Sequence, residues 1–349
     1  MTSKLELGAA LLRSRTFAWR LRLSVSFVSS RSRELGLMLM VLSLLSGCLS
    51  FHAGAMPGEP KDATFANVEG VRVRYVDRGK GPPVVLVHGF ASALDTWNDV
   101  AVALEAKGFR VIALDLKGFG WTDRPEGDYS PGAQAKLVYG LLDQRGVSSA
   151  AWVAHSWGAS VALAAALQQP KRISRLALYD AWVYEEQLPT MFHWARADGV
   201  GEMLFGLWYK ERPDDKITQA FYDPKLVSEK LVEEVEAALD RPGTVAAALA
   251  AVRGQRYAQI QGKYRTITQP AVLLWGREDA VTTLRFGERL SRELPNAKLI
   301  VYPQCGHFPM IEAASASTAD LVTFLEPELA AAQQSAPAPA PASHRSEDE

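Results

Sequence analysis

Residues 150–160 read AAWVAHSWGAS, and they are the clearest indication of the fold in the sequence. Its apolar run, residues 151–154, predicts a buried strand, and residues 159–168 predict a helix. Ser156 lies between the two, flanked at a distance of two residues by Ala154 and Gly158. Small neighbours let the chain turn sharply from strand to helix, and a serine in such a turn is strained and exposes its hydroxyl. We interpret Ser156 as a nucleophile; the alternative is an ordinary serine that caps a helix.

Short apolar runs alternate with helical patterns along most of the chain. After a hairpin around Gly70, further strands are predicted at residues 84–87, 111–114, 151–154, 173–179, 271–275 and 299–302. Helices are predicted at residues 94–107, 131–145, 159–168, 283–294 and 313–325. This alternation indicates an α/β fold, in which a mostly parallel eight-stranded sheet carries helices on both faces.

The alternation stops for about 90 residues between Tyr179 and Ala271, where helix formers and aromatic residues are frequent. We predict a helical cap over residues 181–268, inserted between core segments at 63–180 and 269–329. Most of its aromatic residues should pack within the cap. A minority, Trp182 among them, should line a pocket with Phe90 and Trp157, because ligands bind beyond the carboxyl ends of parallel strands.

A serine hydroxyl needs a neighbouring base to attack at neutral pH, and His307 is the candidate. It follows the last predicted strand, in a loop that Gly306 should loosen so that the imidazole reaches Ser156. The alternative is a surface loop histidine. The other five histidines lie in the tether, the first long strand, beside the serine, in the cap and in the tail: His52, His88, His155, His193 and His344.

A third group must orient the imidazole and stabilise its charged form. Asp279 follows the penultimate strand and gives the chain order serine, aspartate, histidine. Asp180, directly after the 173–179 strand, is a competitor, and we favour Asp279 because of its position after the penultimate strand.

The first long strand ends in Val87-His88-Gly89-Phe90. Gly89 lets the backbone approach a substrate closely. The backbone N–H groups of Phe90 and Trp157 would then form an oxyanion hole. The alternative is a plain turn from strand to loop.

The N-terminal segment is predicted to be a targeting signal rather than part of the folded domain. Residues 1–48 hold seven basic and two acidic side chains, and a short apolar run at residues 35–45 ends in Leu45-Ser46-Gly47-Cys48. A basic start, a short apolar centre and small residues are typical of a signal peptide. The ending resembles the lipobox of bacterial lipoproteins, which implies lipidation at Cys48 and anchoring to a membrane of the bacterial cell envelope. An ordinary secretory signal or a short membrane anchor is the alternative.

The composition limits the partners. The net charge is −1, so nothing suggests nucleic acid. With two cysteines, Cys48 and Cys305, we expect no disulfide scaffold, and Cys305 is predicted to serve packing. No residue spacing predicts a metal or a dinucleotide site, so the predicted chemistry uses no cofactor. Residues 49–62 are expected to be a tether, and residues 330–349, rich in Ala, Pro and Gln, a disordered tail.

Together these motifs resemble the α/β-hydrolase superfamily over residues 65–328. Residues 118–125, GFGWTDRP, are similar to epoxide hydrolases and haloalkane dehalogenases. Those families carry an aspartate where this chain has Ser156, and here Ala91 stands where epoxide hydrolases have a proline. The resemblance with a serine implies a carboxylesterase-like hydrolase that acts on a small acyl substrate through acyl-Ser156. A C–C hydrolase or perhydrolase on the same triad, or a catalytically silent binding protein of this fold, are the alternatives.

Overall fold

The computed structural model describes residues 49–335, and the leader with Cys48 lies outside this range. Its centre is one sheet of eight strands in the order β1-β2-β4-β3-β5-β6-β7-β8. The strands are β1 (Thr64–Val68), β2 (Val71–Arg78), β3 (Pro83–Val87), β4 (Arg110–Leu114), β5 (Ala150–His155), β6 (Ile173–Tyr179), β7 (Ala271–Gly276) and β8 (Ala297–Tyr302). β1 and β2 form the predicted hairpin, in which β2 alone runs antiparallel to the other seven strands of the sheet.

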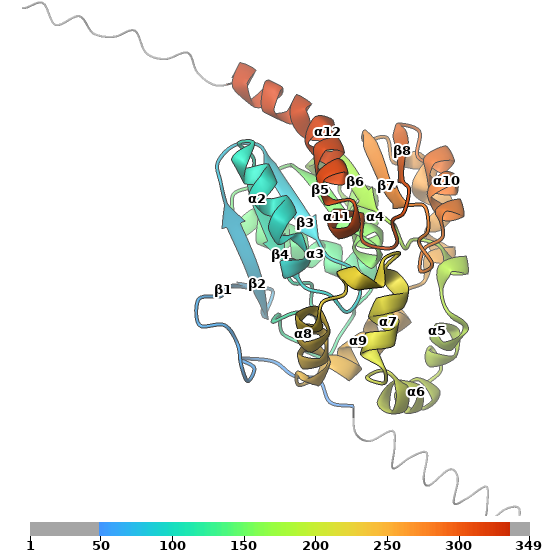
Figure 1. Cartoon of the computed structure of the whole chain (residues 1–349). Coiled ribbons are helices and arrows are strands. Elements are labelled where there is room, and N and C mark those ends of the chain that lie inside the picture. Colours follow the sequence, from blue (N-terminus) through green and yellow to red (C-terminus); the bar gives the residue numbers. More distant parts are fainter. Residues whose placement is uncertain (1–48, 336–349) are drawn as a thin grey trace, which may run out of the picture.

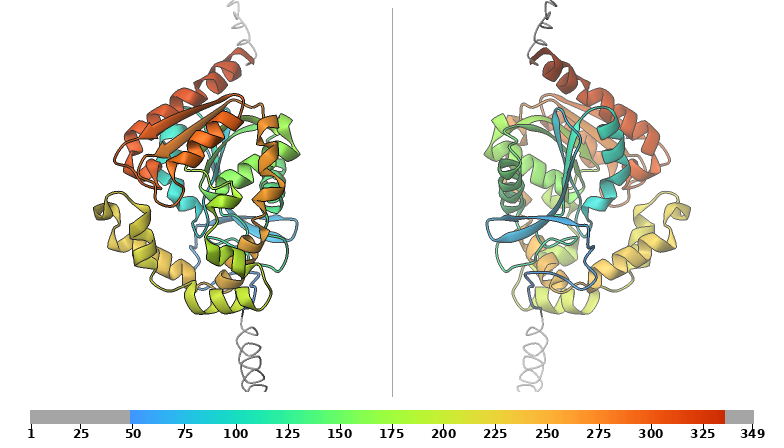
Figure 2. Two further views of the ribbon diagram at one scale, coloured as in Figure 1. Left: turned by 90° about the vertical axis from the view of Figure 1, so that its right-hand side faces the viewer. Right: turned by 90° about the vertical axis from the view of Figure 1, so that its left-hand side faces the viewer.

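Helices cover both faces of the sheet, which confirms the predicted fold class (Figures 1 and 2). One layer consists of α3 (Pro131–Gln144), α4 (Trp157–Gln168) and α10 (Leu284–Glu293). The other consists of α2 (Asn98–Ala106), α11 (Pro309–Glu312) and α12 (Ala314–Ser335). Because each face is covered, every residue of the central strand β5 is buried, as the continuous apolar run 151–154 predicted.

Five helices between β6 and β7 form the cap: α5 (Thr190–Ala195), α6 (Val200–Trp208), α7 (Pro213–Ala220), α8 (Glu229–Asp240) and α9 (Thr244–Gly254). The sequence signals their boundaries in places. Ser228 accepts a hydrogen bond from Leu231 N and so caps α8. Gly243, with φ of +80°, precedes α9. In Figure 1 the cap lies at the end of the sheet where the parallel strands finish.

The two ends of the described chain differ from the expectation. Residues 49–62 are not a free tether, because His52 pairs with Arg124 through backbone hydrogen bonds of 2.7 and 2.8 Å, and Met56 is buried. At the other end, α12 continues past Ala330 to Ser335, with Pro327 inside it. The predicted tail therefore begins at least one helical turn later. Within residues 49–335, no helix is long and apolar enough to cross a membrane.

Candidate active site

Ser156 occupies a strained turn between β5 and α4. Its backbone angles are φ +52° and ψ −121°, a conformation that costs a non-glycine residue energy. Gly158 is required here, since a Cβ atom would lie 2.4 Å from the carbonyl oxygen of His88. Ala154 is fully buried in β5, so its methyl group is accommodated where the usual pattern has a glycine. The side chain of Ser156 lies beneath the cap at 6% exposure.

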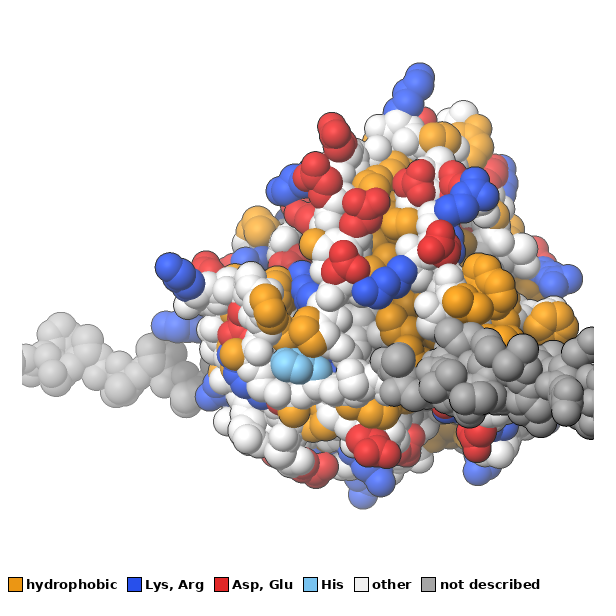
Figure 3. All heavy atoms as spheres, turned by 90° about the horizontal axis from the view of Figure 1, so that it is seen from below, with side chains coloured by type: hydrophobic (Ala, Val, Ile, Leu, Met, Phe, Trp, Pro, Cys, Tyr) orange, Lys and Arg blue, Asp and Glu red, His pale blue; other side chains and the backbone are white. Residues whose placement is uncertain are grey.

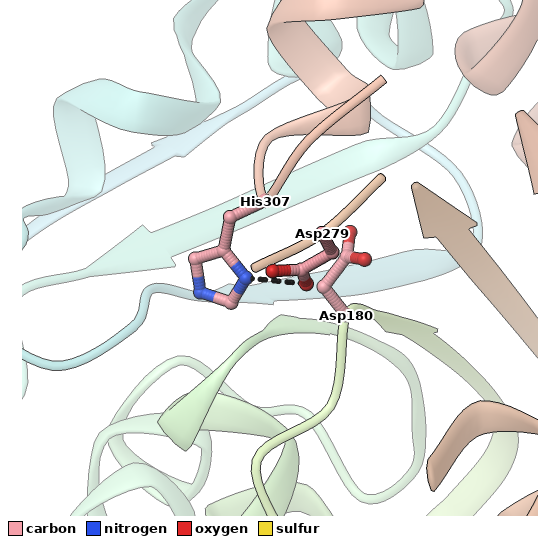
Figure 4. Close-up of side chains that lie close together, drawn as sticks. All are labelled: Asp180, Asp279 and His307. Carbon is pink, nitrogen blue, oxygen red and sulfur yellow. Dashed lines mark hydrogen bonds and ion pairs between the residues drawn. The ribbon is translucent and has the colours of Figure 1, made fainter. Parts of the chain in front are cut away.

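His307 and Asp279 form a buried hydrogen-bonded pair, which Figure 4 shows. His307 Nδ1 lies 2.8 Å from Asp279 Oδ2. The backbone N–H groups of Val281 and Thr282 donate to Asp279 Oδ1 at 2.7 and 2.9 Å. The Thr282 hydroxyl donates to Asp279 Oδ2 at 2.5 Å. The carboxylate is therefore held by four donors.

The protonation of the pair follows from these contacts. Burial raises the pKa of the Asp279 carboxyl, but the facing His307 ring and the hydrogen bonds outweigh it and hold this pKa well below its ordinary value. An ionised Asp279 requires Nδ1 of His307 to carry the proton and donate. Nε2, on the far side of the ring, then has a lone pair, and within residues 49–335 no group hydrogen-bonds it. An imidazole held in this way is prepared to act as a base.

Asp180, the competing acid, lies beside this pair without replacing Asp279. Its carboxyl is fully buried, and Oδ1 accepts a hydrogen bond of 3.0 Å from Gly276 N. One polar atom each of Asp180, Asp279 and His307 lie within 4.8 Å of one another (Figure 4). Burial and the neighbouring Asp279 raise the pKa of Asp180 well above its ordinary value. A protonated Asp180 can donate through Oδ2, which otherwise finds no partner in the described chain, to the Asp279 carboxylate.

This cluster of three side chains has the spacing of a possible metal site. A cation needs anionic carboxylates and an imidazole lone pair directed at it. His307 Nδ1 faces Asp279 Oδ2 at a hydrogen-bond distance of 2.8 Å, so we interpret the cluster as a hydrogen-bonded chain of side chains.

The loop that carries His307 is fixed against the turn at Ser156 from two sides. His155 Nε2 donates to the carbonyl oxygen of His307 at 2.8 Å, and the two rings lie 4.7 Å apart. From the cap, Ala220 O accepts a hydrogen bond of 2.7 Å from His307 N. The described chain contains no hydrogen bond between the Ser156 hydroxyl and His307. His155, the chain neighbour of Ser156, connects the two segments through its bond to His307 O. The hydrogen bond between Ser156 Oγ and His307 that a catalytic triad requires is not formed among the described residues.

Gly306 does not loosen this loop, contrary to the expectation. A Cβ atom at position 306 would lie 2.6 Å from Ala220 O and 2.7 Å from Tyr222 N. The glycine is needed because the cap approaches so closely. Glu312 also joins this loop to the cap, because its carboxylate accepts hydrogen bonds from the backbone N–H groups of Tyr222 and Gly306 at 2.7 and 2.9 Å.

The predicted oxyanion-hole donors lie on the two chain segments that meet at Ser156. A Cβ atom at Gly89 would lie 3.1 Å from Ser156 Cβ, so the 88–90 turn passes directly beside the serine. Neither Phe90 N nor Trp157 N has an acceptor within the described residues, which leaves both donors available. His88 has the expected structural role: its ring donates to Gly89 O at 2.7 Å and accepts from Leu116 N at 2.9 Å.

Aromatic side chains of the cap reach the turn at Phe90. The Phe90 ring lies 5.9 Å from Phe192 and 6.3 Å from Tyr209, both cap residues. Trp182 N donates to Ser156 O at 3.0 Å, and its indole packs near Phe192. Trp157 differs from the expectation, because its indole is only 1% exposed, lies 6.1 and 5.3 Å from the rings of Phe90 and Phe119, and presents no free surface to a ligand.

A cavity of about 510 Å³ lies elsewhere, between α9 and residues 126–129. It is lined by Leu49, Phe51, Tyr129, Glu202 and Arg253 among others. No member of the proposed catalytic set lines it, so this volume is not where a substrate would meet Ser156.

Sequence reasoning missed three contributors to the site: Thr282, Glu312 and the carbonyl of Ala220. Thr282 had a weak signal, since a hydroxyl three residues after an aspartate can return to its carboxylate. Glu312 and Ala220 had none, because their contacts join the cap to the core across more than 80 residues of chain.

Comparison with known proteins agrees with this architecture. A model described as alpha/beta hydrolase fold matches residues 82–221, and one described as TAP-like protein matches residues 249–333. A 2-hydroxymuconate semialdehyde hydrolase of Pseudomonas sp. (strain CF600) is 30% identical over 278 residues, covering 75% of this chain and 93% of that protein. An uncharacterized protein of Mycobacterium tuberculosis is 30% identical over 263 residues, or 72% of this chain and 77% of that protein.

Among solved structures, a meta-cleavage product hydrolase from Pseudomonas fluorescens IP01 superposes with a TM-score of 0.65 and 28% identity, over 76% of this chain and 97% of that chain. A thermophilic esterase from Thermogutta terrifontis has the same fold at a TM-score of 0.65 and 23% identity, over 77% and 99% of the two chains. The chain therefore belongs to the α/β-hydrolase family.

Proposed function

We propose that the chain is a serine hydrolase that cleaves an ester or a related acyl bond through an acyl-Ser156 intermediate. The observation that carries the proposal is the buried bond between His307 Nδ1 and Asp279, placed beside a serine in a strained strand-to-helix turn. A binding protein would have no use for a base held in one tautomer next to such a serine.

The proposed reaction has two steps, acylation of Ser156 and hydrolysis of the acyl-enzyme, and the same groups act in both. His307 Nε2 takes the proton of the Ser156 hydroxyl as Oγ attacks the acyl carbon, and Asp279 stabilises the imidazolium. The backbone N–H groups of Phe90 and Trp157 stabilise the tetrahedral oxyanion. The leaving group departs with the proton from His307, and a water activated by the same imidazole then releases the acid. The hydrogen bond between Ser156 and His307 must form when the substrate enters, as such bonds often tighten on binding.

Hydrolysis of an activated C–C bond is a second candidate on the same side chains. It is favoured by two relatives named above, a 2-hydroxymuconate semialdehyde hydrolase and a meta-cleavage product hydrolase. Both reactions place an oxyanion where Phe90 N and Trp157 N lie. A parallel screen of p-nitrophenyl esters and of dienoate ring-cleavage products separates them by their relative kcat/KM values.

The test of serine catalysis is Ser156→Ala with Ser160→Ala as the matched control. Ser160 lies one turn further along α4, is also buried, and donates to Trp157 O at 2.7 Å. We expect Ser156→Ala to abolish turnover of the best substrate while both variants keep a wild-type unfolding transition. Equal turnover in the two variants would contradict the mechanism, whereas a wild-type protein that turns over no substrate of the screen would favour a silent binding protein.

We further propose that Cys48 is lipidated and anchors the protein at the bacterial cell envelope. The support is the sequence alone: the basic start, the apolar run at residues 35–45 and the ending Leu-Ser-Gly-Cys. Metabolic labelling with a clickable palmitate tests it, with Cys48→Ser expected to lose the label and Cys305→Ser to keep it. Cys305 is a fitting control because it is a free, buried thiol whose pKa burial raises.

A further inference from the structure

The outward face of cap helix α6 is apolar where a surface helix normally carries polar residues. The helix reads VGEMLFGLW, and its one charged residue, Glu202, is paired with Arg253 at 2.8 Å. Its buried side consists of Gly201 and Phe205. Val200, Leu207 and Trp208 are 38%, 44% and 49% exposed. Positions 200 and 207 share one helix face.

The neighbouring helix α5 extends this surface. α5 packs directly against α6, and Trp194 on it is 61% exposed. We call the four side chains Trp194, Val200, Leu207 and Trp208 the cap face. Figure 3, which views the molecule from the cap side, shows hydrophobic side chains among charged ones on this side of the molecule. Exposed large apolar residues on two adjoining helices, with two tryptophans among them, mark a surface that a membrane or another molecule covers.

The start of the described chain indicates what covers it. Leu49 packs against the cluster of Ala195, Phe205 and Leu249, which is the inner side of α5 and α6. Figures 1 and 2 agree in placing this start of the chain beside α6. Residue 48 lies one Cα step, about 3.8 Å, from Leu49. A membrane that residues 35–48 enter would therefore lie near helices α5 and α6, which carry the cap face.

We propose that the cap face lies on the surface of a lipid bilayer. Tryptophan rings favour the interface between lipid and water, and apolar helix faces bind there by burying surface among the acyl chains. The lipid attachment at Cys48, or the apolar run at residues 35–45 itself, would hold the protein to the membrane at this point. The inference uses the position of Leu49 and is independent of the chemistry at Ser156.

Site-specific labelling of the full chain on vesicles tests the orientation. Leu207→Cys carries an environment-sensitive nitrobenzoxadiazole label, and the matched control is Val102→Cys on α2, an apolar residue with 57% exposure away from the cap. Val200→Cys is a second position on the cap face, in case the first variant folds poorly. The wild-type chain, labelled in the same way, is the blank for Cys48 and Cys305.

On vesicles of phosphatidylethanolamine and phosphatidylglycerol, we expect a blue-shifted emission at 207 and 200. We also expect several-fold weaker iodide quenching there and quenching by spin-labelled lipid, with none of these changes at 102. An anchor alone would leave all three positions equally open to iodide, and that result would overturn the proposal. Shielding of 207 without vesicles that grows with protein concentration would assign the cap face to a second copy and also overturn it.

Discussion

Asp180 and Asp279 lie side by side at the ends of β6 and β7, and of the two only Asp279 hydrogen-bonds His307. Two buried carboxyl groups this close cannot both ionise without a large free-energy cost. The charge of the facing His307 ring and side-chain hydrogen bonds from His307, Thr282 and Asp180 hold the pKa of Asp279 low, whereas burial raises the pKa of Asp180. The pair therefore carries one charge, and that charge faces the imidazole.

Asp279→Asn should reduce kcat/KM by on the order of 10³–10⁴-fold, because the amide favours the wrong imidazole tautomer. Asp180→Asn should keep most of the activity, since its amide can still donate to Asp279 and accept from Gly276 N. Steady-state kinetics on the best ester checks both. If Asp180→Asn were the more damaged variant, Asp180 would be the acid.

The pH dependence of stability should report the neutral Asp180. Above the ordinary pKa of an aspartate, the unfolded chain loses this proton while the folded protein keeps it, so wild-type stability falls as pH rises toward the raised folded pKa. Asp180→Asn lacks this loss. Urea unfolding from pH 4 upward should show the variant gaining stability relative to wild type as pH increases. A difference that stays constant with pH would show that Asp180 is ionised in the folded state.

His155 should act as a positioning residue, through its hydrogen bond to His307 O. Burial lowers the pKa of His155 well below its ordinary value, so the ring is neutral and donates from Nε2. We expect His155→Ala to lower kcat about 5–30-fold, the equivalent of one lost hydrogen bond, with KM little changed. His155→Gln should restore part of the rate. Equal losses in both variants, accompanied by equal destabilisation, would indicate a role in packing only.

Gly158→Ala should destabilise the protein by about 1–3 kcal/mol, because the new methyl group collides with two backbone carbonyl oxygens. Gly206→Ala is the matched control in helix α6, where an added Cβ meets nothing within 4 Å. That change should stabilise the helix by about 0.5–1 kcal/mol. Thermal unfolding of the two variants measures the contrast, and similar melting temperatures would argue against the tight turn at Ser156.

Much of this architecture was predictable because its signals are local. The run AWVA is apolar at every position since β5 is covered on both faces, and the small residues at 154 and 158 mark the turn at Ser156. The sequence favoured Asp279 over Asp180 by its position after the penultimate strand, but it could not show how the carboxylate is held, because both residues follow a strand. That arrangement depends on the backbone donors of residues 281 and 282, whose direction only the folded loop defines.

The contacts that fix the His307 loop against the cap could not be predicted from the sequence either. Gly306 looked like a flexible position, yet it is small because the cap backbone at Ala220 and Tyr222 lies against it. The sequence also does not show which tryptophans of α5 and α6 are exposed and which are buried. The side of α6 that faces solvent becomes clear only because Gly201 and Phe205 pack inward.

Covalent labelling with a fluorophosphonate probe, followed by mass spectrometry of the peptide that contains residue 156, is the sharpest test of Ser156 as the nucleophile. We expect a single adduct on the Ser156 hydroxyl, formed rapidly by wild type and slowly by His307→Ala. An unlabelled residue 156 in folded protein, or labelling that is indifferent to the loss of the imidazole, would contradict this assignment.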